Sequence, residues 1–256
     1  MKKILILLFY LLLSSQGWAE YPTNAKNLLH FDGNFNDEIS TRTWAAYAGA
    51  IATTTQAKFG TGSLYCDGTG DYIYQAIPEY FPMGIKDYTI ECWVYPLSTT
   101  GYKYTSWAYQ NLGLSVQGSS NVTVDYLTGG FYRVVSGTST VALNTWSHLA
   151  VSRNYSAGWV KLFVNGICET SSVLVDNNDA DSGSILAIGG VSGMTTYSFN
   201  GYIDEYLLTT SAKYSGSFTP PTSPYSNVQF ATIFFSPGGT INFAPSGMLD
   251  FSRIME

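Results

Sequence analysis

Apolar and polar residues alternate in short runs along most of the chain, which is the pattern of β-strands buried on one face. The clearest run covers residues 87–96 and ends at Pro96, which has no N–H to donate to a neighbouring strand. Its predicted core face consists of Tyr88, Ile90, Cys92 and Val94, and its predicted outward face of Glu91, Trp93 and Tyr95. No longer run has helical periodicity, so the pattern predicts an all-β protein.

Further runs of this kind follow one another at the spacing of about 8–12 residues that is typical of a β-sandwich, with glycine-containing turns between many of them. We expect strands within residues 28–31, 44–57, 104–109, 112–117, 121–127, 131–136, 146–153, 160–166, 185–190 and 199–208. The count and spacing favour a single large antiparallel sandwich.

Residues 58–77 contain two apolar-rich strands on either side of the sequence Asp67-Gly68-Thr69-Gly70-Asp71. The glycines supply the positive φ angles that a tight turn needs, so we predict a hairpin here. Leu64 and Cys66 are expected in the core. Asp67 and Asp71 are expected to accept hydrogen bonds from turn amides.

Residues 1–19 have the composition of a secretory signal peptide, and we expect cleavage before Glu20. Two lysines precede an apolar run, and the segment ends in Gly17-Trp18-Ala19. A retained N-terminal anchor is the alternative. No later segment is long and apolar enough to cross a membrane, so the sequence predicts a protein that is secreted, either extracellular or held in the periplasm or at the cell surface.

Prolines in residues 218–225 exclude helix and regular strand pairing, and they are expected to close the main domain, residues 27–225, in extended form. Residues 226–256 then form a separate extension, with a predicted β-hairpin around Pro237-Gly238-Gly239. Two strands alone are marginally stable in water. The extension must therefore pack on the sandwich, on another copy of the chain or on a partner, and self-association through residues 226–256 is one of these alternatives.

The composition excludes some partners. Without the two leader lysines the formal net charge falls from −6 to −8, which disfavours binding to nucleic-acid phosphates. Charged residues make up 12% of the chain and aromatic residues 16%, including 20 tyrosines. The predicted surface is therefore polar but weakly charged. Cys66, Cys92 and Cys168 are compatible with one disulfide and a free thiol or with three thiols, and Cys66 and Cys92 occupy expected core positions.

Five segments, in their order along the chain, resemble the motifs of laminin G-like (concanavalin A-like) jelly-roll domains. They are residues 59–73, 88–95, 146–151, 162–166 and 199–205, and the resemblance covers about residues 27–225. It implies an antiparallel jelly-roll sandwich of two sheets, which the residues 226–256 would extend by a small C-terminal β-hairpin. It also implies binding of glycans or proteins more often than catalysis, frequently with a structural calcium ion. The disulfide of the related pentraxins is not expected, because Ala150 stands at its second position.

Calcium ligands are expected where oxygen-bearing side chains are regularly spaced. Asp32, Asn34 and Asn36 have such a spacing. Alternation with Tyr206 and Leu208 places Asp204 on the inward face of its strand or at the rim of that face, where a carboxylate needs a cation or N–H donors. The alternative is an Asp204 held by backbone amides beside an ordinary turn at Asp32. A weaker second site is the acidic loop with Asp176, Asp179 and Asp181, which is otherwise a solvated loop.

The outward face of residues 88–95 is the predicted ligand site. Aromatic rings stack on the C–H faces of sugars, and carboxylate or imidazole groups between them bind hydroxyls. Trp146 and His148 share one face of a strand expected nearby. The alternative is that these side chains pack under a loop or under the C-terminal extension. The predicted ligand-binding residues are Glu91, Trp93, Tyr95, His148 and, from the rim loops at residues 102–109, Trp107.

Catalysis is not expected. Hydrolysis of a glycosidic bond needs two carboxylates, and Glu91 has no acidic partner two or four residues further along its strand. Neither His30 nor His148 lies in a recognisable nucleophile motif. The sequence therefore predicts a secreted, non-catalytic module that binds carbohydrate or adheres to a cell-surface or protein partner. The alternative is a subunit of a surface appendage or virion-like assembly.

Overall fold

The computed structural model describes residues 19–76, 86–108, 112–118, 121–128, 131–173, 185–226, 234–235 and 241–242. These residues form strands and loops only. None of them forms a helix that could cross a membrane. The predicted leader up to residue 18, the acidic loop 176–181 and most of the extension 226–256 lie outside the described residues.

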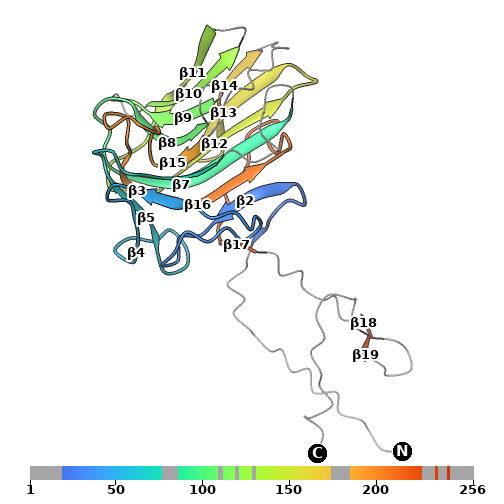
Figure 1. Ribbon diagram of the computed structural model, residues 1–256. Coiled ribbons are helices and arrows are strands. Elements are labelled where there is room, and N and C mark those ends of the chain that lie inside the picture. Colours follow the sequence, from blue (N-terminus) through green and yellow to red (C-terminus); the bar gives the residue numbers. More distant parts are fainter. Residues whose placement is uncertain are drawn as a thin grey trace, which may run out of the picture.

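The sandwich consists of two antiparallel sheets that lie face to face (Figure 1), which confirms the all-β sandwich prediction. The 8-stranded sheet contains, in spatial order, β14 (Ile167–Val173), β13 (Trp159–Val164), β12 (Ser147–Asn154), β7 (Tyr88–Ser98), β16 (Asn200–Thr209), β5 (Ser63–Asp67) and β4 (Ile51–Thr53), and β2 (Ala25–Leu29) also pairs with β16. The 7-stranded sheet contains β11 (Phe131–Thr140), β10 (Asn121–Thr128), β9 (Leu112–Val116), β8 (Lys103–Ala108), β15 (Ile185–Ile188), β6 (Tyr72–Ala76) and β3 (Ala45–Tyr47).

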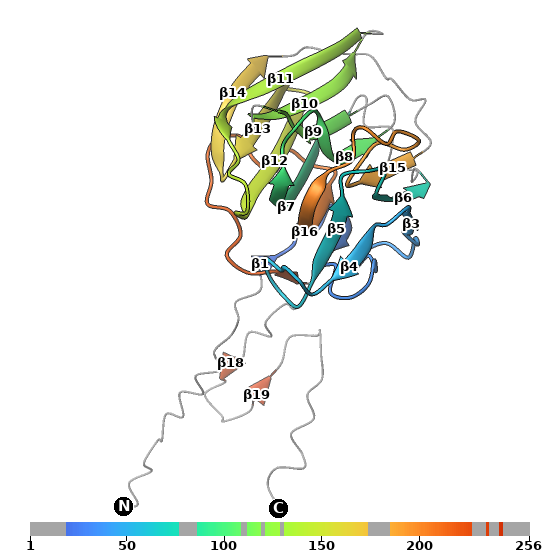
Figure 2. The same cartoon turned by 90° about the vertical axis from the view of Figure 1, so that its left-hand side faces the viewer.

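Two short pairs complete the described strands. β1 (Ala19–Glu20) runs parallel to β17 (Tyr225–Ser226) at one end of the sandwich (Figure 2). β18 (Phe234–Phe235) and β19 (Ile241–Asn242) are antiparallel, as the predicted hairpin around residues 237–239 requires.

The core lies between the sheets and is built by alternate residues of both. The predicted core face of β7 is buried in full, and Leu149, Leu114 and Ile188 contribute from neighbouring strands of the two sheets. Cys66 and Cys92 are free, fully buried thiols in this core, which confirms their interpretation as small apolar residues. Cys168, on β14, is half-buried.

The predicted hairpin at residues 58–77 is wrong, because its two strands belong to different sheets. β5 pairs with β16 and β4, whereas β6 pairs with β15 and β3. Gly68 and Gly70, with φ angles of +90° and +95°, turn the chain from one sheet to the other. Asp71 accepts hydrogen bonds from the N–H groups of Gly49 (2.6 Å) and Asp67 (2.8 Å), so its predicted role at turn amides is confirmed.

After β16 the chain crosses the outer face of the 8-stranded sheet. We call residues 210–226 the strap, which Figure 2 shows in dark orange on its way to β17. The backbone of Lys213 donates to Thr89 Oγ1 (2.9 Å), and the backbone of Phe218 donates to Gly166 O (2.8 Å). The strap therefore covers part of the face that the sequence predicts to bind a ligand.

Candidate functional site

The structure brings Glu91, Trp93 and His148 together on the outer face of the 8-stranded sheet, as their alternation indicates. Trp93 and His148 are directly opposite each other on β7 and β12, and their ring centroids are 5.2 Å apart. All three side chains are nevertheless buried, with exposed fractions of 0% for Glu91, 8% for Trp93 and 1% for His148. A ligand therefore has no direct access to them.

The strap closes this part of the face with an ionic and aromatic cover. Lys213 Nζ and the Tyr225 hydroxyl each lie 2.5 Å from Glu91 Oε1. The Phe218 ring packs edge-on against His148, with centroids 5.7 Å apart. The second carboxylate oxygen, Glu91 Oε2, lies 3.8 Å from His148 Nε2 and makes no hydrogen bond in the described part of the chain. We call Glu91, His148, Lys213 and Tyr225 the Glu91 cluster.

The charges of the Glu91 cluster follow from burial and from its one lysine. Burial alone raises the pKa of a carboxyl, but Lys213 and His148 bring the pKa of Glu91 below its ordinary value. Burial lowers the pKa of His148 to about 4, so this imidazole is neutral at pH 7. A neutral histidine and a paired carboxylate under a packed cover suit the alternative of packing under the C-terminal part of the chain. Ligand binding by Glu91, Trp93 and His148 stays a prediction.

Further along the same outer face, four aromatic rings cross the strands in one row. Tyr202 is directly opposite both Tyr65 on β5 and Tyr95 on β7. Ring centroids are 5.1 Å apart for Tyr65 and Tyr202, 5.8 Å for Tyr95 and Tyr202, and 5.5 Å for Tyr95 and Trp146. Tyr65, Tyr95 and Trp146 are half-exposed, and Tyr202 is 9% exposed. We call these four residues the aromatic row.

The fifth predicted residue, Trp107, lies on the opposite side of the molecule. It is on β8 of the 7-stranded sheet, and its half-exposed ring packs edge-on against Tyr104, with centroids 5.0 Å apart. Tyr104 also contacts the ring of Tyr197, which is 37% exposed. The predicted rim at residues 102–109 is therefore a strand of the other sheet, and it does not adjoin the Glu91 face.

A carboxylate completes this second surface. The Tyr104 hydroxyl donates to Asp125 Oδ2, and burial raises the pKa of Asp125, although Tyr104 opposes this. Gly113 lies opposite both Trp107 and Asp125 on its neighbouring strands. A Cβ atom at Gly113 would lie 2.5 Å from Tyr104 Cε1 and 2.8 Å from Trp107 Cε3, so the missing side chain lets both rings lie on the sheet. We call Tyr104, Trp107, Gly113, Asp125 and Tyr197 the Trp107 patch.

One polar atom of the Trp107 patch lacks a partner. Trp107 Nε1 is buried and makes no hydrogen bond to any described residue. An indole N–H in this state loses the hydrogen bond that it makes with water in the unfolded chain. The surface therefore offers one half-exposed ring, and the indole N–H and the Asp125 carboxylate, which is 7% exposed, are buried beside it.

Sequence reasoning missed several members of these surfaces. Tyr65 and Tyr202 lie in different motifs, and only the strand order places both beside Tyr95. Asp125 did leave a signal, because it is a single carboxylate in an apolar run at residues 121–127.

Two of the four predicted calcium ligands, Asp204 and Asp32, accept hydrogen bonds from backbone N–H groups of the turn at residues 58–62. Asp204 Oδ2 accepts from Lys58 (2.8 Å) and Phe59 (3.1 Å), and Asp32 Oδ1 accepts from Thr61 (2.5 Å) and Gly62 (2.9 Å). Positive hydrogen atoms thus occupy the positions that a cation needs. Among the described residues, no group of three or more His, Cys, Asp and Glu side chains is placed to hold a metal ion. These side chains do not fit a calcium site in this arrangement.

The predicted orientation of Asp204 is also wrong. A bulge in β16 between Asp204 and Leu207, with Glu205 at a φ angle of +50°, shifts the alternation, so Asp204 lies opposite the outward-facing Trp93. Asn34 Oδ1 accepts only from the local Asn36 N–H (2.7 Å) in an exposed turn. Burial, followed by the neighbouring Glu205, raises the pKa of Asp204 to about 8 against the effect of its N–H donors. Calcium binding stays a prediction.

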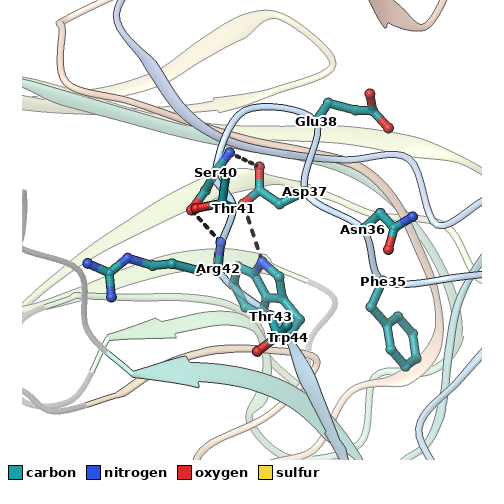
Figure 3. Close-up of a pocket in the computed structure, with 9 residues that line it drawn as sticks. All are labelled: Phe35, Asn36, Asp37, Glu38, Ser40, Thr41, Arg42, Thr43 and Trp44. Carbon is teal, nitrogen blue, oxygen red and sulfur yellow. Dashed lines mark hydrogen bonds between the residues drawn. The ribbon is translucent and has the colours of Figure 1, made fainter.

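The loop of residues 35–44 surrounds an open hollow of about 500 Å³ (Figure 3). Asp37 holds this loop in shape, because its carboxylate accepts hydrogen bonds from Ser40 N (3.1 Å), Trp44 Nε1 (3.3 Å) and Asn27 Nδ2 (2.5 Å). Figure 3 shows the Glu38 and Arg42 side chains pointing away on opposite sides. The carboxylate of Asp37 is thus committed to the loop itself.

Comparison with protein families identifies the fold. A laminin G family model, described as the concanavalin A-like lectin/glucanases superfamily, matches residues 67–213. No curated protein sequence matches the chain.

Solved structures have the same fold at low sequence identity. Domain 4 of AbnA, an extracellular arabinanase of Geobacillus stearothermophilus solved with arabinotriose, is 17% identical with a TM-score of 0.55, and the match covers 74% of this chain and 93% of that chain. The ligand-binding domain of botulinum neurotoxin serotype D, solved with N-acetylneuraminic acid, is 12% identical with a TM-score of 0.58, over 75% of this chain and 48% of that chain. The binding domain of the Paraclostridial mosquitocidal protein 1 is 15% identical with a TM-score of 0.57, over 75% and 50%.

Proposed function

The chain belongs to the concanavalin A-like lectin/glucanases superfamily, and from this premise we propose that it is a non-catalytic module that binds carbohydrate through the Trp107 patch. The observation that carries the proposal is the half-exposed Trp107 ring beside Asp125, with an indole N–H that has no partner among the described residues. A sugar stacks its C–H face on such a ring. Asp125 is 7% exposed and the indole N–H is buried, so the sugar hydroxyls bind these two groups once the neighbouring rings shift to admit them.

Relatives of the same fold support this class of ligand. The similar structures include one domain solved with arabinotriose and one solved with N-acetylneuraminic acid. The Trp107 patch contains a single carboxylate, Asp125, whereas glycoside hydrolysis uses two. Binding without turnover is therefore the activity that we propose, and the leader-like residues 1–19 support export of the protein.

A glycan array followed by isothermal titration tests the proposal, with arabinotriose and N-acetylneuraminic acid as the first probes. We expect Trp107→Ala to weaken binding of an array-positive glycan at this site at least tenfold, which is about 1.4 kcal/mol. Trp159→Ala is the matched control, because Trp159 is also half-exposed but lies on β13 of the other sheet. A folded Trp107→Ala variant that keeps both the affinity and the stoichiometry of the unchanged protein would overturn the assignment of the site, and a blank array would overturn the function.

A further inference from the structure

The aromatic row has a polar row beside it on the 8-stranded sheet. Asn200 lies opposite both Asp67 on β5 and Ser98 on β7, two residues from Tyr202 along the same strand. Asp67 is exposed, and Asn200 and Ser98 are half-exposed. The outer face thus presents a line of rings and, parallel to it, a line of carboxylate, amide and hydroxyl groups.

The strap leaves this part of the face open. It covers the Glu91 cluster, and the aromatic row lies beyond that cluster along β7, where Tyr95 and Trp146 remain half-exposed. Each ring of the aromatic row contacts its neighbour, edge-to-face for Tyr95 and Tyr202 and tilted for the other two pairs, which restricts the rotamers before any ligand arrives. A surface whose side chains are already ordered loses less conformational entropy on binding.

The chemistry of the two rows selects one class of occupant. We propose that the aromatic row is a second carbohydrate-binding surface, for a neutral oligosaccharide whose C–H faces stack on the rings and whose hydroxyls bind Asp67, Asn200 and Ser98. The acidic Asp67 and the net charge of the chain disfavour an anionic sugar or an anionic membrane surface. The inference rests on the proposed function only in that both surfaces take the same class of ligand.

Two such surfaces on one molecule have a consequence that a single site lacks. The Trp107 patch and the aromatic row lie on the outer faces of different sheets, so they point in opposite directions. Each molecule then holds two glycan chains and cross-links them, with an avidity that one face cannot provide.

Two measurements test the inference: turbidity and gel retardation with a soluble neutral arabinan, and titration of arabinotriose. If the protein does not bind arabinan, a neutral polysaccharide that is positive on the array and its trisaccharide serve as the probes. We expect the unchanged protein to cross-link the polysaccharide and to bind two trisaccharides. Tyr95→Ala/Tyr202→Ala and Trp107→Ala should each bind one trisaccharide and lose cross-linking, and the combined variant should bind none. If the double tyrosine variant unfolds early, Ser98→Ala/Asn200→Ala, which keeps the rings but removes two of the proposed hydroxyl partners, should weaken one of the two sites.

The outcomes separate the inference from the proposed function. Complete loss of binding in Trp107→Ala alone overturns the second surface and leaves the first in place. Unchanged stoichiometry in Tyr95→Ala/Tyr202→Ala overturns it as well. A change in sedimentation of that variant, without a change in glycan binding, would show that the aromatic row is a contact between copies of the chain, and this too overturns the proposal.

Discussion

Glu91 shows how a single charged side chain determines what covers a sheet face. Its carboxylate is fully buried, and it has Lys213 as its cation and Tyr225 as a second donor, both from the strap. A buried carboxylate that loses its cation retains the full cost of leaving water. Glu91 Oε1 therefore couples the strap to the sheet, in addition to the backbone hydrogen bonds of Lys213 and Phe218.

Lys213→Met should lower the free energy of unfolding by about 3–5 kcal/mol, because it leaves Glu91 charged and unpaired. Lys161→Met is the matched control: Lys161 also anchors the strap, through Ser215 O, but at the exposed surface, and its loss should cost less than about 1 kcal/mol. Urea denaturation of both variants measures the difference. Glu91→Gln/Lys213→Met should recover much of the loss, and equal effects of the two lysine variants would contradict this account.

His148 should give the stability a pH dependence of defined sign. Its pKa is lowered to about 4 in the folded protein against an ordinary value of 6.5, so the unfolded chain binds the proton more tightly. Its contribution is complete above pH 6.5 and is lost as the pH falls to 4, by about 3 kcal/mol at most. His148→Gln should flatten this part of a stability–pH curve measured in urea. His30→Gln should not, because the pKa of His30 is raised, and a variant curve that keeps its slope would contradict the assignment to His148.

At the scale of the residue, alternation predicted the faces of β7 correctly, from Tyr88 to Tyr95. It failed at Asp204, because one bulge with a positive φ angle at Glu205 inverts the faces, and nothing in the local sequence announces it. The sequence around β7 also does not show that a distant segment, the strap, buries Glu91. Glu91 and Tyr95 have the same parity, yet the strap covers only the first.

At the scale of the element, the turn between β13 and β14 shows why the strap takes its path. Gly166 has a φ angle of +78°, and a Cβ atom there would lie 2.0 Å from Phe218 O. The strap backbone thus occupies the space that a side chain would need, and the Phe218 N–H uses that approach to bond Gly166 O (2.8 Å).

Gly166→Ala should therefore destabilise the protein by about 2–4 kcal/mol, from backbone strain and from the clash with the strap. Gly216→Ala is a control within the strap, because nothing lies within 4 Å of its Cβ position, and it should change stability by no more than about 0.5 kcal/mol. Thermal melts of both variants check the contrast. A Gly166→Ala variant as stable as the control would show that the strap is not held in this way.

Elements were easier to predict than their partners. The strands at 88–98, 112–116 and 147–154 lie where the sequence indicates, since apolar residues recur at every second position in them. The connection at residues 68–71 was misread, because two amphipathic strands joined by glycines suit a hairpin and a crossing between sheets equally well. Strand order depends on contacts between distant segments, such as β5 with β16, which a local pattern does not contain.

At the scale of the whole molecule, the effect of metal ions on thermal stability distinguishes two roles for Asp32 and Asp204. They either bind a calcium ion or accept hydrogen bonds from the backbone of residues 58–62. Because both carboxylates bind backbone N–H groups of residues 58–62, we expect EDTA to leave the melting temperature unchanged. Calcium saturation should likewise have no effect. A calcium-dependent rise of several degrees, which corresponds to about 1–2 kcal/mol for a chain of this size, would establish the metal site after all.

The parallel pairing of β1 with β17 has a topological consequence. Glu20 and Ser226 are direct partners, so the two ends of the described sandwich are about 5 Å apart. A linker of a few residues can join them, and the chain can then be opened at the exposed turn around Ala157 between β12 and β13. Such a circular permutant keeps every strand pairing of both sheets. The same two-sheet sandwich should therefore form when the strands follow one another in a different order along the chain.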